Sequence, residues 1–515
     1  MKILLFNQYF TSSKNSSEKI KASLPLNLLY LGSYLQYKGL ECKIYELGAF
    51  SDEDEVVFGE ERIRCGLSDE KITEIIKTEN PKIIAIGCMY SRHYIDVVNI
   101  AKLIKSISQE IKVIIGGNHA TDLCDMVLKT PQFDFVVRGE GEITIHELCQ
   151  AILSGQKDFS TIKGLAYRQG NEIVKTENRE LIKNLDDLPP LDYSLVDLKR
   201  YLRNVKSPYI MRSPVMGIAS SRGCPGHCVY CTVKAVWGRR WRARSAMRTV
   251  DEIEHLHKKY GIGEFSFLDD SASVDKKRWN DICYEIRRRR LNIKWSTPNG
   301  IAHWTLDKPT LLNMKKAGCY RITFGIESGD SEMRKFIGKP YPLSQAKELI
   351  QYANKIGMWT ICTHIIGFPY ETRRQIMRTI RFAKISGTDF AAFYSLSPMP
   401  TADVYQYFKK EGLLDFDFIF SDENLNSDKY EEMYQMLSDG NAPTVYFKPE
   451  QLGQIIADAY KSFIFYRALT FLNPMRTIRK INSIEDLRYT ARLVFTGIKL
   501  LTKSFYKKTT QALIR

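Results

Sequence analysis

Three closely spaced cysteines stand in the segment SRGCPGHCVYC. Cys224, Cys228 and Cys231 have the spacing Cys-x3-Cys-x2-Cys. Thiolates are soft ligands that suit iron–sulfur clusters or zinc. Three such ligands leave one iron of a four-iron cluster open, and the glycines and the proline between them favour a tight loop that can wrap a cluster. The spacing therefore predicts that these three residues bind a metal centre.

Zinc with a distant fourth ligand, such as His227 or His255, is the alternative for the same triplet. The place of the triplet in the chain favours the cluster, because it follows the apolar run 215–221 that opens a repeat of strands and helices. Chemistry in parallel barrels takes place at the carboxyl ends of the strands. The other eight cysteines stand alone, and we expect them to be small buried hydrophobes.

Residues 214–397 alternate apolar runs with amphipathic helices. This alternation predicts an incomplete parallel barrel of six βα units. The predicted strands are VMGIASS, GEFSFLDD, IKWSTP, YRITFGIES, WTICTHIIG and FAAFYSLS. Polar residues and glycine end several of these runs, so we expect them at one edge of the barrel: Asp269, Asp270, Glu327, Ser328 and Gly367.

Residues 1–150 hold five short β-rich runs separated by helical stretches. The runs cover 2–6, 42–47, 82–87, 112–117 and 133–137. Strands that are apolar throughout indicate a parallel sheet with both faces covered, and five of them fit a flavodoxin-like, doubly wound α/β domain. The loops after the strands are the usual binding crevice of this fold, and Gly116, Gly117 and Gly139 there allow a ligand to approach the backbone closely.

The predicted domains are 1–150, a connector over 151–210, the barrel over 211–400 and a helical region over 401–515. The connector contains a predicted hairpin over 164–176. The start, MKILLFNQYF, lacks the long apolar segment of a signal peptide, and no apolar run reaches membrane-spanning length. We therefore expect a cytoplasmic protein.

A formal net charge of +16 indicates an acidic partner, and the charge gathers near the end of the chain. Residues 461–515 hold twelve Lys and Arg against Glu485 and Asp486. This region predicts either a basic amphipathic segment at an anionic membrane surface or an ordinary helix packed on the barrel. Residues expected on a shared apolar face are Leu493, Phe495, Ile498, Leu501 and Phe505. No nucleic-acid-binding module accompanies the charge, so we expect no nucleic-acid partner.

The cysteine segment, in which Tyr230 directly precedes the third cysteine, resembles the signature of the radical S-adenosylmethionine (SAM) superfamily. The resemblance implies a [4Fe–4S] cluster, SAM bound to its open iron, and a 5′-deoxyadenosyl radical that abstracts a substrate hydrogen. It implies a position near the adenine for Tyr230. It also implies that Asp269 and Asp270 lie near the methionyl end of SAM, and Glu327 and Ser328 near the ribose or the substrate.

The segments GIES and IGFP, the second of which contains Gly367, resemble the cobalamin-associated branch of that superfamily. Residues 1–150 resemble its cobalamin-binding module, and the similarity reaches to about residue 410. The cofactor-binding residues that this implies are Met89, Ser91, Gly116, Gly117, His119, Gly139 and Glu140. The loop NQYFTSSKNSSE holds no His, so we expect no His ligand to cobalt from it. A domain that keeps the fold without the cofactor is the alternative.

The resemblance implies methyl transfer to an unactivated carbon of a small molecule. The apolar, basic C-terminal region favours a lipid or isoprenoid substrate. A cobalamin-associated radical cyclase, coupling or rearrangement enzyme is the alternative within the branch, and a non-catalytic metal-binding or lipid-surface protein is the alternative outside it. Either enzyme needs a one-electron reductant such as flavodoxin or ferredoxin.

Overall fold

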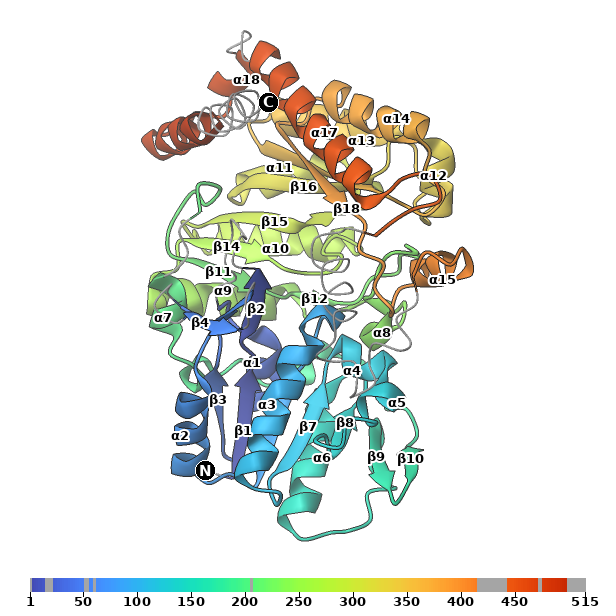
Figure 1. Ribbon diagram of the computed structural model, residues 1–515. Helices are drawn as coiled ribbons and strands as arrows, with labels where there is room; N and C mark the ends of the chain where they lie inside the picture. Colours follow the sequence, from blue (N-terminus) through green and yellow to red (C-terminus); the bar gives the residue numbers. More distant parts are fainter. Residues whose placement is uncertain are drawn as a thin grey trace. The chain divides into compact units, whose positions relative to one another are not determined.

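The computed structural model describes residues 2–13, 22–50, 55–58, 62–203, 207–414, 442–470 and 475–497. The chain divides into two compact units, and each crosses the predicted domain boundaries (Figure 1). The N-terminal unit consists of Met1–Asn204, Gly223–Ala243 and Ser397–Ala442. The barrel unit consists of Val205–Arg222, Arg244–Leu396 and Pro443–Arg515. The cysteine loop therefore groups with the N-terminal unit, although it leaves the first barrel strand along the chain.

A seven-stranded sheet forms the centre of the N-terminal unit, in the order β10-β9-β8-β7-β6-β1-β3. Five neighbouring strands of this sheet, in the order β3-β1-β6-β7-β8, are parallel. This is the strand order of a flavodoxin-like fold, as predicted. Strands β1, β6, β7 and β8 are buried almost throughout, which explains their continuous apolar sequences, whereas β3 lies at the edge of the sheet and exposes Lys43. Their bounds are β1 (Ile3–Asn7), β3 (Cys42–Glu46), β6 (Ile83–Gly87), β7 (Lys112–Gly116) and β8 (Phe135–Val137).

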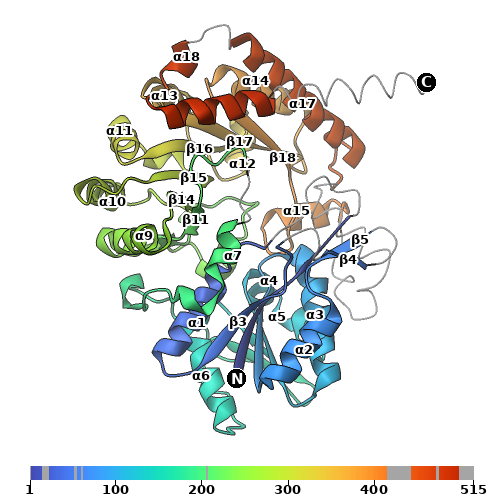
Figure 2. The same cartoon turned by 90° about the vertical axis from the view of Figure 1, so that its left-hand side faces the viewer.

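Helices cover both faces of this sheet. Figure 2 shows α1 (Leu26–Tyr37) and α6 (Gly141–Leu153) on one side, with α2 (Asp69–Glu79) and α3 (Tyr94–Ile107) on the other. The contacts agree, because α1 packs against α6 and α2 packs against α3. The short α4 (Asn118–Asp122) follows β7 directly.

The predicted hairpin is confirmed, and it belongs to the main sheet. Strands β9 (Leu165–Gln169) and β10 (Glu172–Lys175) pair antiparallel, and β9 pairs antiparallel with β8. The sequence did not predict the small antiparallel sheet of β2 (Phe10–Ser13), β5 (Arg62–Cys65) and β4 (Glu55–Phe58). The sequences FTSS and RIRC carry no continuous apolar run, which is why the pattern missed them.

The barrel unit is an open parallel sheet of six strands in chain order, as predicted. Its strands are β11 (Val215–Ile218), β14 (Glu264–Phe267), β15 (Lys294–Ile301), β16 (Cys319–Glu327), β17 (Trp359–Ile366) and β18 (Phe390–Ser395). Helices α9 (Ala246–Tyr260), α10 (Lys276–Arg288), α11 (Lys308–Lys316), α13 (Leu343–Lys355) and α14 (Arg373–Ile385) follow the strands. Figure 2 shows α9, α10 and α11 along the outside of the sheet. Trp279, Trp295 and Phe267 meet edge-to-face in its core.

The C-terminal part of the barrel unit is helical, as predicted. Helix α17 (Pro449–Thr470) packs on β18 and α14. The short α18 (Met475–Ile478) and a helical segment over 484–497 follow. Among the described residues, no helix has the length and apolar character to cross a membrane.

Candidate active site

The cysteine loop has a glycine between its first two thiols. A Cβ atom on Gly226 would lie 3.3 Å from Cys224 Sγ and 3.7 Å from Cys228 Sγ, so any larger residue would crowd both sulfurs. Gly223 has φ +83°, and a Cβ there would collide with the Arg240 carbonyl oxygen. All three cysteines have intermediate exposure, and Tyr230 beside them is also partly exposed. The loop thus presents three accessible thiols, and its backbone needs glycine at positions 223 and 226.

The thiols are not gathered around the position of a single ion. Among the described residues, no three His, Cys, Asp or Glu side chains converge on one metal ion. His227 is exposed, and the His255 ring packs against Tyr260 with ring centroids 6.1 Å apart.

Two segments of the N-terminal unit hold the loop in shape. Arg239 donates a 2.9 Å hydrogen bond to the Gly226 carbonyl oxygen and pairs with Asp403 at 3.5 Å. Asp403 also forms an ion pair with Lys234, the first residue of α8 (Lys234–Trp237). The Val404 amide donates a 2.7 Å hydrogen bond to the Val229 carbonyl oxygen, between the second and third cysteines. The segment after β18 therefore fixes the backbone of the cysteine loop.

A buried ion pair joins the end of this loop segment to the domain built on the seven-stranded sheet. Arg242 Nη1 lies 2.9 Å and 2.8 Å from the two Glu140 carboxylate oxygens. The same guanidinium donates to the Ile182 carbonyl oxygen at 2.6 Å, and the Ile182 amide donates to Glu140 at 2.7 Å. Glu140 is thus engaged inside the protein, and its predicted contact with a cofactor stays a prediction.

The carboxyl edge of the N-terminal sheet combines exposed apolar side chains with buried polar ones. Met89 and Tyr90, directly after β6, are exposed. Ser91 and His119 are buried, and Ser91 Oγ lies 2.9 Å from His119 Nδ1. Burial lowers the pKa of His119 to about 3, so the ring is neutral at neutral pH. The exposed side chains of Met89 and Tyr90 suit contact with a large apolar ring. The buried His119 instead contacts Ser91 and so supports the loop after β6 from inside the protein.

The three glycines at this edge of the sheet differ in the structural reason for which glycine is needed at each position. Gly117 has φ +105°, and a Cβ there would lie 2.5 Å from the Cys88 carbonyl oxygen, so the crossing of two loops already demands glycine. Gly139 has φ +75° with open space around the Cβ position. At Gly116 a Cβ would meet Val137 at ordinary contact distance. Open space at Gly139 fits the close approach of a ligand, and the roles of all three stay predictions.

In the barrel unit, Asp269 organises the residues that precede the cysteine loop. It accepts hydrogen bonds from the Ser220 amide at 3.1 Å, from Ser220 Oγ at 2.7 Å and from Ser221 Oγ at 2.5 Å. Asp269 is buried, whereas Asp270 is exposed. Of the two predicted cofactor contacts, Asp270 has the accessibility that contact requires, and Asp269 is held by internal bonds.

Glu327 ends β16 in a backbone conformation that is rare for its type. Its φ is +62°, in the left-handed region, and such strain gathers at functional sites. Lys339 Nζ lies 2.7 Å from Glu327 Oε1, and Thr363 Oγ1 lies 3.4 Å from Oε2. The next residue, Ser328, is buried and hydrogen-bonded with Thr379 and Asp330. The Glu327–Lys339 pair therefore forms the polar centre at this strand end.

The turn after β17 is built around Gly367 and Glu371. Gly367 has φ +98°, and its amide donates a 2.9 Å hydrogen bond to the Glu371 carboxylate. Glu371 is fully buried, and burial raises its pKa to about 8. The turn is thus held by an internal carboxyl group.

The sequence missed Arg239, Arg242, Lys339 and Asp403. Each acts through a partner far away in the chain or beyond a turn, so no local spacing marked it. The one available signal was the position of Asp403 in SPMPTADVY, directly after the sixth predicted strand.

Comparison with known families gives two matches. Residues 218–383 match the radical SAM superfamily, and residues 23–149 match the B12-binding domain. The chain belongs to the radical SAM superfamily, in the branch that carries a B12-binding domain. This membership confirms the predicted family, fold class and cofactor classes, namely an iron–sulfur cluster, SAM and cobalamin.

Curated relatives include methyltransferases. An uncharacterised methyltransferase of Pyrococcus horikoshii is 33% identical over 77% of this chain and 82% of its own length. The cytidylyl-2-hydroxyethylphosphonate methyltransferase of Streptomyces wedmorensis is 28% identical over 80% of this chain and 83% of its own. The anaerobic magnesium-protoporphyrin IX monomethyl ester cyclase of Rubrivivax gelatinosus is 28% identical over 66% of this chain and 60% of its own.

Solved structures share the fold. The radical SAM methyltransferase TsrM of Kitasatospora setae matches with a TM-score of 0.67 and 17% identity, over 89% of this chain and 88% of its own. The cobalamin-dependent radical enzyme OxsB matches with a TM-score of 0.58 and 17% identity, over 85% of this chain and 55% of its own.

Proposed function

We propose that this enzyme is a cobalamin-dependent radical SAM methyltransferase that methylates an unactivated carbon of a small molecule. The observation that carries the proposal is the grouping of the cysteine loop with the B12-binding domain in one compact unit. Methyl transfer needs the radical source and the methyl carrier to serve one substrate. The Arg242–Glu140 pair, at 2.8 Å, ties their two segments together.

In this proposal Cys224, Cys228 and Cys231 hold the [4Fe–4S] cluster, and Tyr230 lies beside the adenine of SAM. Cobalamin occupies the carboxyl edge of the N-terminal sheet, against the exposed Met89 and the open Gly139. When bound, the cluster and SAM supply the 5′-deoxyadenosyl radical and cobalamin supplies the methyl group. The protein positions these groups and excludes water.

The chain's own residues supply positioning and charge. Arg239 and Val404 fix the loop backbone, while Asp269 fixes the residues before it. Lys339 holds the Glu327 carboxylate at the end of β16. We propose that Glu327 and Asp270 bind SAM or the substrate, and that a small acidic one-electron donor, flavodoxin or ferredoxin, reduces the cluster. A lipid or isoprenoid remains our proposal for the substrate class.

The cyclase reading keeps one specific support, the similarity to the protoporphyrin ester cyclase. The methyltransferase relatives favour the first reading, because they match 77% and 80% of this chain against 66% for the cyclase. An isotope experiment separates the two readings.

Cells that produce the full chain are supplied with methionine deuterated at its methyl group, and their extracts are compared by mass spectrometry with those from the Cys224→Ala variant. We expect a metabolite that gains a deuterated methyl group only with the active chain. The buried Cys283 provides the matched control, because Cys283→Ala removes a thiol without touching the loop. New unlabelled products together with 5′-deoxyadenosine would favour the cyclase.

A further inference from the structure

The helical segment over 484–497 presents an apolar face to solvent. Ile484, Leu487, Val494 and Phe495 are 70%, 53%, 41% and 70% exposed. Their spacing, together with exposed Ala491, follows the helical period, so they line one side of the helix. Large apolar side chains gathered in this way mark an interaction surface.

The opposite side of this helix packs on the barrel. Tyr489 and Leu493 are buried in a cluster with Trp359, Tyr320 and Met211. The expectation that Leu493 and Phe495 share a face is therefore wrong, because the two point to opposite sides. The other residues expected there, Ile498, Leu501 and Phe505, lie outside the described residues. The exposed apolar face is thus distinct from the face that packs on the barrel. The packed face fixes the position of the helix and therefore of the exposed side chains.

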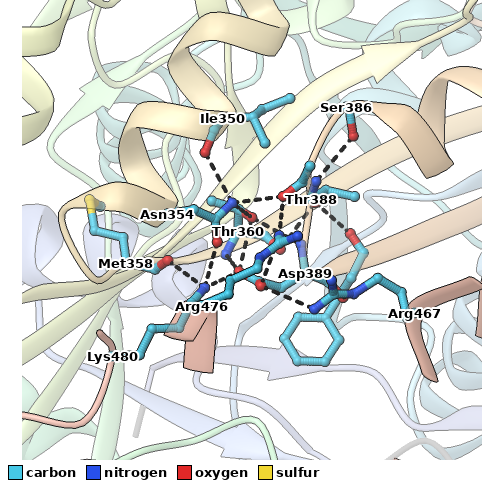
Figure 3. A network of polar contacts seen from close by, with 12 residues as sticks. Ile350, Asn354, Met358, Thr360, Ser386, Thr388, Asp389, Arg467, Arg476 and Lys480 are labelled. Carbon is cyan, nitrogen blue, oxygen red and sulfur yellow. Dashed lines mark hydrogen bonds and ion pairs between the residues drawn. The ribbon is translucent and has the colours of Figure 1, made fainter. Parts of the chain in front are cut away.

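Part of the basic charge in this region is internal. Figure 3 shows Asp389, fully buried, with Arg467, Arg476 and Lys480 around it. Arg476 Nη2 lies 3.0 Å from Asp389 Oδ1, Arg467 Nη2 lies 3.4 Å from the same oxygen, and Lys480 pairs with Oδ2. These three cations pair internally and fasten the C-terminal helices to the barrel.

Three further basic residues of the described chain lie at the surface around the apolar helix. Arg488 is exposed beside Leu487, and Arg479 is exposed next to Ile478. Arg492 is also exposed, and its Nη2 donates hydrogen bonds to the Ile210 and Met211 carbonyl oxygens at 2.8 Å and 3.2 Å. Further exposed apolar side chains lie on α17 and α18: Phe465, Leu469, Met475 and Ile478. Exposed apolar side chains thus lie on all three helical segments, with exposed cations on 484–497 and directly after α18.

A basic pocket of about 630 Å³ opens beside these segments, at the end of the barrel where the strands begin. Its cations come from β15, α11, α13 and the chain after α18: Lys294, Lys315, Lys316, Lys355 and Arg479. Its one carboxylate, Asp486, lies 4.0 Å from Lys294 and accepts hydrogen bonds from the Asn482 amide and the Ser483 hydroxyl. Lys315 is partly buried, and this burial lowers its pKa, so an anion in the pocket would stabilise its charged form.

We propose that this C-terminal surface docks the enzyme on an anionic phospholipid membrane, with a headgroup phosphate in the basic pocket and the apolar side chains of 484–497 in the interfacial layer. Lysine and arginine around a pocket are the groups that bind phosphate, and interleaved apolar side chains bury shallowly in lipid. This proposal is independent of the methyl-transfer reaction.

Charge decides between a membrane and a second copy of the chain. A symmetric dimer through this face would bring Arg488 and Arg492 of both copies together, and the chain carries a formal net charge of +16. An anionic lipid surface instead attracts the same residues, over a distance set by the ionic strength.

The test is co-sedimentation of the full chain with vesicles of phosphatidylcholine alone and of phosphatidylcholine mixed with phosphatidylglycerol. We expect binding to the anionic vesicles that weakens as salt rises. The triple variant Lys316→Glu, Lys355→Glu, Arg479→Glu should lower partitioning by on the order of 100-fold or more. The double variant Leu487→Asp, Phe495→Asp should remove the binding that persists at high salt.

Matched controls change similar side chains elsewhere on the barrel unit. Lys258→Glu and Lys277→Glu alter exposed cations on α9 and α10, and Tyr284→Asp alters an exposed aromatic side chain on α10. These controls should bind as the parent chain does. Equal binding of the parent chain to both vesicle types overturns the proposal. So does unchanged binding by both test variants, or a dimer in solution that Leu487→Asp, Phe495→Asp dissociates.

Discussion

Arg242 and Glu140 form a buried ion pair with 2.8 Å between Nη1 and Oε2, across 102 residues of sequence. The pair joins the segment after the cysteine loop to the start of α6 in the B12-binding domain. A carboxylate this deeply buried depends on its partner, because removal of one charge leaves the other without compensation. The contribution of this pair to the free energy of unfolding therefore measures how strongly the cysteine loop segment is bound to the B12-binding domain.

We expect Arg242→Met to lower the free energy of unfolding by about 3 kcal/mol or more, because Glu140 is left buried and charged. Urea denaturation followed by circular dichroism measures this change. The control is Lys163→Met, which removes one partner of the exposed Lys163–Glu177 pair and should cost less than about 1 kcal/mol. Similar losses in both variants would show that the buried pair is unimportant.

We expect anaerobic reconstitution to give about four iron atoms per chain, and Cys224→Ala, Cys228→Ala or Cys231→Ala to lose them. Iron and zinc are counted by elemental analysis of the purified protein. Cys319→Ala is the matched control, since Cys319 is a fully buried core thiol whose loss should leave the iron content unchanged. One zinc per chain without iron uptake would instead establish the zinc alternative.

We expect hydroxocobalamin to bind without a protein His on cobalt. Electron paramagnetic resonance of the reduced Co(II) form should carry no nitrogen splitting from a protein His, so His119→Gln should leave the spectrum unchanged. The reason is that His119 is buried beside Ser91, with its ring packed against Tyr94. A nitrogen signal that disappears in His119→Gln would contradict this prediction.

We expect the free energy of unfolding to fall as the pH rises from 4.5 to about 8, because of the raised pKa of Glu371. Its pKa is about 8 in the folded chain, above the ordinary value of 4.5, so the folded state keeps a proton that the unfolded state releases between these pH values. The loss is about 1.4 kcal/mol per pH unit within that window, and it levels off above pH 8. Glu371→Gln should remove this part of the pH dependence in urea denaturation. A variant with the same slope as the parent chain would assign the dependence to other groups.

We expect Asp389→Asn to loosen the C-terminal helices, because three cations then lose the carboxylate that compensates them. Limited proteolysis should cut within 442–497 much faster than in the parent chain. Asp458→Asn is the control on α17, where an exposed pair with Lys461 contributes little. Equal cleavage rates would show that the apolar cluster alone holds these helices.

Central strands such as β6 were predictable because they are buried on both faces and read as apolar runs, as KIIAIG does. The cysteine loop was predictable because its ligands are neighbours in the chain. The contacts that hold that loop in shape were not predictable. Arg239 and Asp403, for example, stand 164 residues apart in the sequence and pair at 3.5 Å only in the folded chain. The positive φ of Glu327 and its ion pair with Lys339 likewise leave no trace in the sequence, because Glu rarely adopts this backbone conformation and its partner stands 12 residues away.

The contacts of Asp403 and Val404 with the cysteine loop also set an order of events during synthesis. The B12-binding domain leaves the ribosome first, yet the bonds that shape the loop require residues that follow the sixth barrel strand. Domains usually fold as they emerge. Here the bonds from Asp403 and Val404 cannot form until all six barrel strands have been translated, so a truncated chain that ends before residue 403 carries the three thiols without these contacts.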